Sequence, residues 1–192
     1  MMSANGCDPR LVFYSGKHVI LRVLTEQDVM NSPWVGWFND EDLCRYNVHH
    51  VFPNTFERQL EHQKSAVSST KIQLGVVDKN EPEKLCGFVS LQSIDYVHRN
   101  AEIAGFQDQR VTSNRPQLFF ESWSIMLRHA FETLNLEKVY GGTFHPHVPV
   151  ALERMLGFQV EGVQKRHIFK NGRYHDVTLL AVFRDTVKYP EF

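Results

Sequence analysis

Apolar residues recur at helical spacing in the middle of the chain. From Phe119 to Leu134 they fall at positions i, i+4, i+7, i+8, i+11, i+12 and i+15, which places them on one face of an α-helix. We therefore expect a long helix that packs this face against the rest of the fold. The stripe consists of Phe119, Trp123, Met126, Leu127, Ala130, Phe131 and Leu134.

The segment after this helix predicts a strand, a short helix and a hairpin. Lys138 to Phe144 is long enough for one short strand. Pro149 suits the first turn of a helix and Gly157 suits its end, so the stretch ALERML is predicted to be helical. Asn171 and Gly172 form the dipeptide that a type I′ hairpin turn prefers. Strand-like apolar positions flank this turn, namely Phe158, Val160, Val163 and Ile168 before it and Tyr174, Val177, Leu179, Ala181 and Phe183 after it.

The N-terminal half alternates strands and helices. Leu11 to Val23 reads as one or two strands, and Thr25 with Asp28 is a capping pattern for a first helix. Asn54 with Glu57 three residues later predicts the start of a second helix. This mixed order favours a single sheet covered by helices on both faces. Further strands are predicted over Ile72 to Val77 and Leu85 to Ile94, around a polar turn at Lys79 to Lys84.

Length and composition fit one domain. The 192 residues are 42% hydrophobic and 22% charged, so the chain can bury a core, and we expect a single domain over residues 1–192 with residues 1–10 as a disordered tail. A formal net charge of −1 provides no basic field for nucleic acid or anionic lipid. No apolar run approaches a membrane span, and the start MMSANGCDPR lacks the apolar core of a signal peptide, so we expect a cytoplasmic protein. Three scattered cysteines suggest reduced thiols.

Several segments follow one another in a recognisable order. The N-terminal half contains HVILRVLTEQDV, WFNDEDLCRYN, CGFVSL and NAEIAGF, and the C-terminal half contains AFETLNLEKV, LERMLGFQVEG and NGRYHDVTLL. From about Lys17 to Asp185, this series resembles the GNAT superfamily of N-acetyltransferases, in the branch of ribosomal-protein and amino-sugar acetyltransferases. The resemblance implies an α/β fold of the GNAT type, with a central, mostly antiparallel twisted sheet of about seven strands, splayed in the middle and flanked by about four helices.

The resemblance also implies acetyl-CoA as co-substrate, with no metal. In the family, a strand that here reads AEIAGFQDQ holds the pantetheine arm, and a loop that here reads RVTSNRPQ wraps the pyrophosphate at a helix N-terminus. The expected CoA-binding residues are Phe106, Gln107, Asp108, Arg110, Asn114, Arg115, Gln117 and Leu118.

The phosphate loop departs from the family pattern. Asn114, Gln117 and Phe119 occupy the three pattern positions, so both small residues are missing, and Pro116 removes a backbone donor. One interpretation is a modified CoA site in which Arg110 and Arg115 replace backbone contacts, while Ser113 or Asn114 caps the helix. The alternative is that the loop no longer binds CoA, which would leave a non-catalytic GNAT-like binding module.

The proton-transfer residues are also partly changed. Glu102, in the NAEIAGF strand, matches the position from which relatives abstract a proton from the acceptor amine, with an ion pair to Arg99 as the alternative. Many relatives carry a tyrosine acid where this chain has Glu153. His145 is therefore a second catalytic candidate, while its neighbour His147 adds only a weak metal signal without a third ligand.

The acceptor is expected to bind near the N-terminal helices. Trp34, Trp37, Asn39, Asp40 and Tyr46 lie in the segment that forms the acceptor side in relatives, with core packing as the alternative for the tryptophans. We predict transfer of an acetyl group to a primary amine of a small molecule such as an amino sugar. A protein N-terminal amine is the alternative acceptor, a homodimer is left open, and neither nucleic acid nor a membrane is expected as a partner.

Overall fold

A computed structural model describes residues 8–112 and 115–192. The strands are β1 (Val12–Ser15), β2 (Val19–Val23), β3 (Val67–Ser68), β4 (Lys71–Asp78), β5 (Leu85–Asp95), β6 (Asn100–Gln107), β7 (Lys138–Thr143), β8 (Gln159–Lys170) and β9 (Arg173–Phe183). The helices are α1 (Glu26–Asn31), α2 (Trp34–Trp37), α3 (Phe56–Lys64), α4 (Gln109–Thr112), α5 (Pro116–Arg128) and α6 (Val148–Leu156), with a π-helical segment η1 (His129–Thr133) directly after α5.

The strands of the described residues form one sheet. Its order is β1-β2-β4-β5-β6-β7-β9-β8, with β3 paired to β4, and all neighbours are antiparallel except the parallel pair of β6 and β7. The predicted mixed, mostly antiparallel sheet is confirmed. It has more strands than predicted because Leu11 to Val23 folds into the β1–β2 hairpin and Val67–Ser68 adds a short strand.

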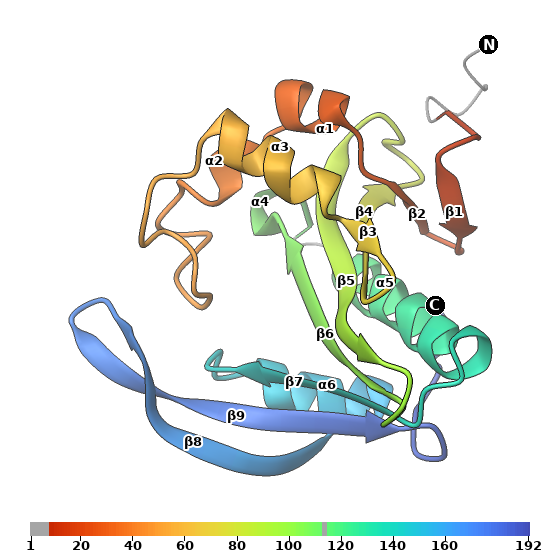
Figure 1. The fold of residues 1–192 in the computed structure, drawn as a ribbon, viewed down its shortest axis with the longest axis vertical. Coiled ribbons are helices and arrows are strands. Elements are labelled where there is room, and N and C mark those ends of the chain that lie inside the picture. Colours follow the sequence, from red (N-terminus) through yellow and green to blue (C-terminus); the bar gives the residue numbers. More distant parts are fainter. Residues whose placement is uncertain (1–7, 113–114) are drawn as a thin grey trace.

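The sheet splits between β6 and β7. These strands pair only where Asn100, Ala101 and Glu102 face Lys138, Val139 and Tyr140, although β6 continues to Gln107 and β7 to Thr143. Figure 1 shows the consequence: β5 and β6 run steeply while β7 and β9 run almost horizontally, so the two halves of the sheet diverge from their shared corner. The splayed sheet expected from the resemblance is confirmed.

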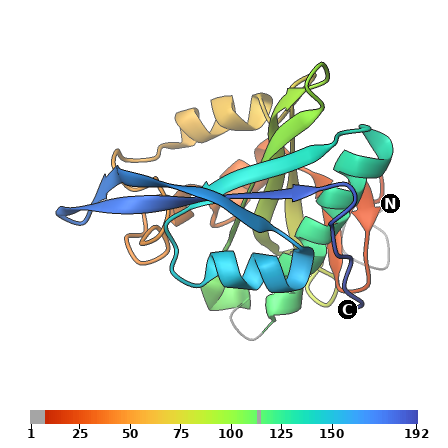
Figure 2. The ribbon, with the colours of Figure 1, turned by 90° about the horizontal axis from the view of Figure 1, so that it is seen from below.

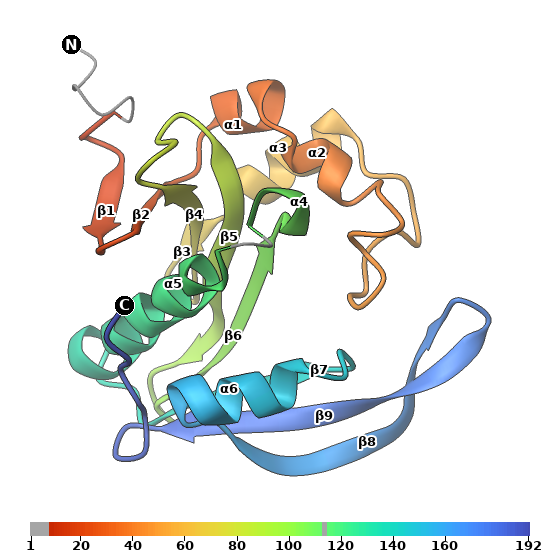
Figure 3. The ribbon, with the colours of Figure 1, turned by 180° about the vertical axis from the view of Figure 1, so that it is seen from behind.

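Helices cover both faces of the sheet. Helix α5 contacts β2, β4 and β5, and α6 contacts β9. Figure 3 shows α5 and α6 on one face, while Figures 1 and 2 show α3 on the other. Each layer has its own core: α5 buries Leu118, Met126 and Leu127 against the sheet, whereas α1 and α2 bury Val29 and Trp34.

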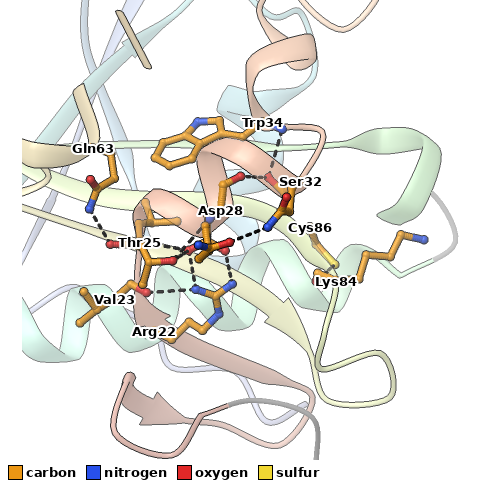
Figure 4. Close-up of polar contacts among 12 residues, drawn as sticks. Arg22, Val23, Thr25, Asp28, Ser32, Trp34, Gln63, Lys84 and Cys86 are labelled. Carbon is orange, nitrogen blue, oxygen red and sulfur yellow. Dashed lines mark hydrogen bonds and ion pairs between the residues drawn. The ribbon is translucent and has the colours of Figure 1, made fainter. Parts of the chain in front are cut away.

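Helix α1 is anchored by a buried ion pair. The Thr25 and Asp28 capping box is present as predicted, and Asp28 also accepts a hydrogen bond of 2.8 Å from Nη1 of Arg22 on β2 (Figure 4). Burial alone would raise the pKa of Asp28, but the Arg22 guanidinium and the Thr25 donors hold it below its usual value. This pair fixes the start of the helical layer that covers one face of the sheet.

Two predicted helix starts need correction. Helix α3 is capped by Thr55, whose hydroxyl accepts from the Arg58 N–H at 3.3 Å, and not by Asn54. Ser113 and Asn114, the predicted caps of α5, lie outside the described residues, and the N-cap residue Arg115 makes no side-chain cap bond.

The C-terminal turns match the prediction. Gly157 ends α6 with a φ of 82°, and a Cβ there would collide with the Thr186 carbonyl oxygen. Asn171 and Gly172 have φ values of 51° and 75° at the tip of the β8–β9 hairpin, as a type I′ turn requires. The tip is held in place because the Lys170 ammonium donates to the Asn47 carbonyl oxygen at 2.9 Å, so the hairpin touches the loop after α2.

Candidate active site

A large cleft occupies the split in the sheet. Its volume is about 1530 Å³, and its walls come from β5, β6, β7, the first turns of α5 and α6, α3 and the loop after α2. Gly105 of β6 and Gly141 of β7 face it from the two diverging strands. The cleft therefore passes from the face covered by α5 and α6 to the face covered by α3.

The edge of β6 presents backbone groups to this cleft. The Asp108 N–H donates to the Cys86 carbonyl oxygen at 2.9 Å, which sets the alternation of the β5–β6 ladder. In an antiparallel pair, every second residue directs its N–H and C=O toward the partner strand. Phe106, two residues before Asp108, therefore directs these groups toward β5, whereas Gly105 and Gln107 direct theirs into the split. An extended ligand can hydrogen-bond there as an additional strand would.

Two glycines beside the split allow neighbouring groups to approach closely. A Cβ on Gly141 would lie 3.1 Å from the Ile103 carbonyl oxygen, and a Cβ on Gly105 would lie 2.7 Å from the indole nitrogen of Trp123. Trp123 in turn stacks on Phe119, with ring centroids 4.9 Å apart. Phe119, which occupies a position where the family has a small residue, is partly buried and packs against the core cluster that contains Trp123.

Glu102 lies where the two strands begin to diverge. It is the last β6 residue paired with β7, and on its other side it pairs with Gln92 of β5. Its half-buried side chain lines the cleft. Its carboxylate has no hydrogen bond or ion pair within the described residues. The alternative pairing with Arg99 is wrong, because Arg99 contacts Glu137 at 3.5 Å and donates to the Asn135 carbonyl oxygen at 2.8 Å.

His145 stands on the opposite wall, after β7. Its Nδ1 accepts a hydrogen bond of 3.2 Å from the backbone N–H of His147, so the neutral ring carries its proton on Nε2. Partial burial, and then the proximity of His147, lower the pKa of His145 below 6.5. Tyr46 packs its ring edge against His145 at a centroid distance of 4.5 Å. His145 is therefore a neutral hydrogen-bond donor near pH 7.

The two arginines expected at the CoA phosphates are engaged by carboxylates. Arg110 contacts Asp108 at 2.8 Å and Asp40 at 2.9 Å, and these carboxylates raise the pKa of its guanidinium. Arg115, next to the start of α5, forms an ion pair with the buried Asp78. Neither arginine lines the cleft.

The remaining expected CoA contacts divide into two groups. Phe106 and Gln107 line the cleft, although the Phe106 ring packs against Trp37 at 5.2 Å in the core below α2. Asp108, Gln117 and Leu118 do not line it, and Leu118 is fully buried, so we correct the expectation that its side chain binds CoA. Asn114 lies outside the described residues.

The expected acceptor residues are also only partly at the cleft. Trp34 and Trp37 are fully buried, and the Trp37 indole donates to Asp108 at 2.9 Å, so we correct their assignment to core packing. Asn39 exchanges two hydrogen bonds with the Asn54 backbone, of 2.7 and 2.8 Å, and does not line the cleft. Tyr46 does line it and is 41% exposed.

Two glutamines were missed by the sequence interpretation. Gln59 on α3 and Gln73 on β4 are each 2% exposed, yet both line the cleft. Gln73 is the one polar residue between Lys71 and Asp78, the ends of β4 (KIQLGVVD), and this break in the apolar pattern was the available signal. The capping pattern drew attention to the start of α3 instead of its buried face.

Residues 8–112 and 115–192 contain no cluster of three or more histidine, cysteine or acidic side chains arranged to hold a metal ion. None of their helices combines the length and the apolar character needed to cross a membrane.

Comparison with known proteins places the fold. No protein-family model and no curated sequence matches the chain. Among solved structures, spermidine N-acetyltransferase from Vibrio cholerae, in complex with CoA and spermine, superposes with a TM-score of 0.76 at 23% identity, covering 89% of this chain and 98% of that one. A structure named as a probable acetyltransferase gives 0.75 at 20% identity over 92% and 98%. Mutant forms of the Vibrio cholerae enzyme give 0.69 at 25% identity over 88% and 96%. The chain has the fold of these acetyltransferases.

Proposed function

From the GNAT fold of this chain, we propose that the protein transfers an acetyl group from acetyl-CoA to a primary amine of a small molecule. The observation that carries the proposal is the split beyond Glu102 and Tyr140, which opens a cleft through the sheet beside a carboxylate that has no partner among the described residues. The similarity to a spermidine N-acetyltransferase crystallised with CoA supports amine acetylation as the class of reaction. The amino sugar remains our predicted acceptor within that class.

The residues at the split fit an acyl-pantetheine arm. Gly105 and Gln107 offer backbone donors and acceptors along the β6 edge, and Gly141 leaves the facing edge without a side chain. The start of α5 fits a diphosphate less well. Pro116 has no N–H, and the Leu118 N–H already donates to the Arg115 carbonyl oxygen at 3.0 Å. The proposal assigns the positive charge there to Arg110 and Arg115, although both are paired with carboxylates and neither lines the cleft.

Glu102 acts as the general base, and His145 acts as a hydrogen-bond donor to the reaction's developing charge. Glu102 removes the proton of the acceptor ammonium, and the neutral amine then attacks the thioester carbonyl carbon. A C–N bond forms and the C–S bond breaks, with its electron pair leaving on sulfur. His145, through its Nε2–H, donates a hydrogen bond to the developing negative charge. The nitrogen that has attacked then loses a second proton, which the thiolate takes up to give the free thiol, while the proton first taken by Glu102 is released to solvent.

Ligand binding and turnover test this proposal together. Acetyl-CoA should raise the melting temperature of the protein, because a ligand that binds the folded state stabilises it by mass action. Release of free thiol should then depend on an added primary amine. A folded protein that shows neither response would be a binding module of a different kind. Acetylation of a peptide N-terminus in preference to small amines would instead favour the alternative acceptor.

A further inference from the structure

The acceptor side of the cleft contains two buried amide donors. Nε2 of Gln59 and Nε2 of Gln73 have no hydrogen-bond partner within the described residues, although both side chains are only 2% exposed. A buried N–H that is left unpaired is costly, so a site that keeps two of them selects ligands that can accept hydrogen bonds.

The amide orientation of Gln59 is fixed by its neighbours. The Asn54 Nδ2 group donates to Oε1 of Gln59 at 3.0 Å and to the Val35 carbonyl oxygen at 3.2 Å. Since a second amide nitrogen in place of Oε1 would face this donor, Gln59 turns its oxygen to Asn54, and its nitrogen is left without a partner within the described residues. His62 lies three residues after Gln59, on the same face of α3. Its Nε2 lies at hydrogen-bond distance, 2.9 Å, from Oε1 of Gln73.

These donors and Glu102 belong to one surface. Gln73 pairs with Ser90, Ser90 pairs with Ala104, and Glu102 lies two residues from Ala104 on the same face of β6. Two strand spacings and two residues of rise put the Cα atoms of Gln73 and Glu102 roughly 12 Å apart. A single small molecule can therefore present an amine to Glu102 and oxygens to the glutamines.

The charge of the cleft argues against a polycation. Its charged lining consists of Asp42, Arg45, Arg58 and Glu102, and Asp42 is paired with Arg45 at 2.7 Å. Within the described lining, Glu102 is the one carboxylate without an ion pair. A polyamine would bring further ammonium groups that find no acid and would leave both amide donors unpaired.

We infer that Gln59 and Gln73 select a small acceptor that carries one primary amine together with hydroxyl or carbonyl oxygens, and that the protein discriminates against polyamines. This inference rests on the proposed acetyl transfer and specifies its substrate class. It separates this chain from the spermidine N-acetyltransferase to which its fold is similar.

Matched acceptors test the inference. With acetyl-CoA at saturation, kcat/KM is measured for glucosamine against cyclohexylamine, for glycinamide against propylamine, and for spermidine. The best oxygen-bearing amine should exceed its oxygen-free analogue and spermidine by about tenfold or more. Preference for spermidine, or equal rates within both pairs, would overturn the inference while leaving the acetyltransferase proposal intact. No turnover of any amine, together with no thermal shift by acetyl-CoA, would overturn both.

Variants identify the residues responsible. Gln59→Leu and Gln73→Leu should each reduce the preference about tenfold by raising KM for the oxygen-bearing amine, with little change for the oxygen-free one. Gln159→Leu, at an exposed β8 position outside the cleft, should change neither value. Melting temperatures are compared first, and Gln73→Met replaces a leucine variant that does not fold. An unchanged preference in folded variants of both glutamines would refute the assignment.

Discussion

The split between β6 and β7 and the start of α5 are the two ends of the proposed CoA site, and they differ in the chemical groups that they offer to the ligand. At the split, the functional groups are backbone atoms exposed by strand divergence, and Gly141 places no side chain against the Ile103 carbonyl oxygen on the facing strand. At α5, the loop glycines are replaced, and the available charges, Arg110 and Arg115, are held by Asp108 and Asp78. The split therefore offers backbone groups to a ligand, whereas the start of α5 offers charged side chains that already have carboxylate partners.

The largest expected effect tests the chemistry at the split. Glu102→Gln should lower kcat/KM about a hundredfold or more near neutral pH, because the ammonium loses its base. The loss should shrink at high pH, where the amine is already neutral. Steady-state rates across this pH range check the prediction, with Glu83→Gln, at an exposed position in the turn between β4 and β5 and outside the cleft, as the matched control. A wild-type pH profile in the Glu102 variant would make the carboxylate structural.

The second prediction concerns the phosphate end. Arg110→Ala and Arg115→Ala should each weaken acetyl-CoA binding about ten- to a hundredfold, the effect of losing a charge-assisted contact. Binding of S-acetylpantetheine, which lacks the diphosphate, should not change. Calorimetric titration of both donors separates the two ends of the site. Unchanged acetyl-CoA affinity in both variants would mean that the arginines serve only Asp108 and Asp78.

A third, smaller effect is expected at the opposite wall of the split. His145→Phe should reduce kcat about tenfold by removing the Nε2–H donor. Because burial and His147 lower the pKa of His145 below 6.5, its ring is already neutral at pH 7, and the loss should be constant from pH 7 to pH 9. His98→Phe, at an exposed position outside the cleft, serves as the control. A loss that varies with pH over this range would instead indicate that His145 transfers a proton.

The smallest effect concerns the loop that closes the acceptor side. Lys170→Met removes the ammonium that bonds the Asn47 carbonyl oxygen but keeps the apolar stem, so KM for the acceptor should rise about fivefold while acetyl-CoA affinity stays constant. Lys165→Met, whose exposed side chain pairs with Asp176 on the same hairpin, is the matched control. Equal KM values in the two variants would show that the hairpin tip does not order the loop.

Local sequence patterns predicted the elements where short-range physics decides. The capping box at Thr25 and Asp28, the end of α6 at Gly157 and the turn at Asn171 and Gly172 each depend on residues within a few positions of one another. The order of the motifs along the chain predicted the fold and the strand on which Glu102 lies. The apolar stripe also placed Phe119 and Trp123 four residues apart on one helical face, where their rings pack together.

Only the tertiary structure decided which side chains meet in the cleft. Trp34 and Trp37 looked suited to an acceptor, but the packing of α2 on the sheet buries both. Gln59 and Gln73 are far apart in sequence from Glu102, and they share a surface with it because α3 lies over β4 and because the β4, β5 and β6 register aligns their rows. Sequence alone determined the elements and the family of folds, since those follow from local periodicity and order. The chemistry of the site depends on long-range register and burial, which no local pattern contains.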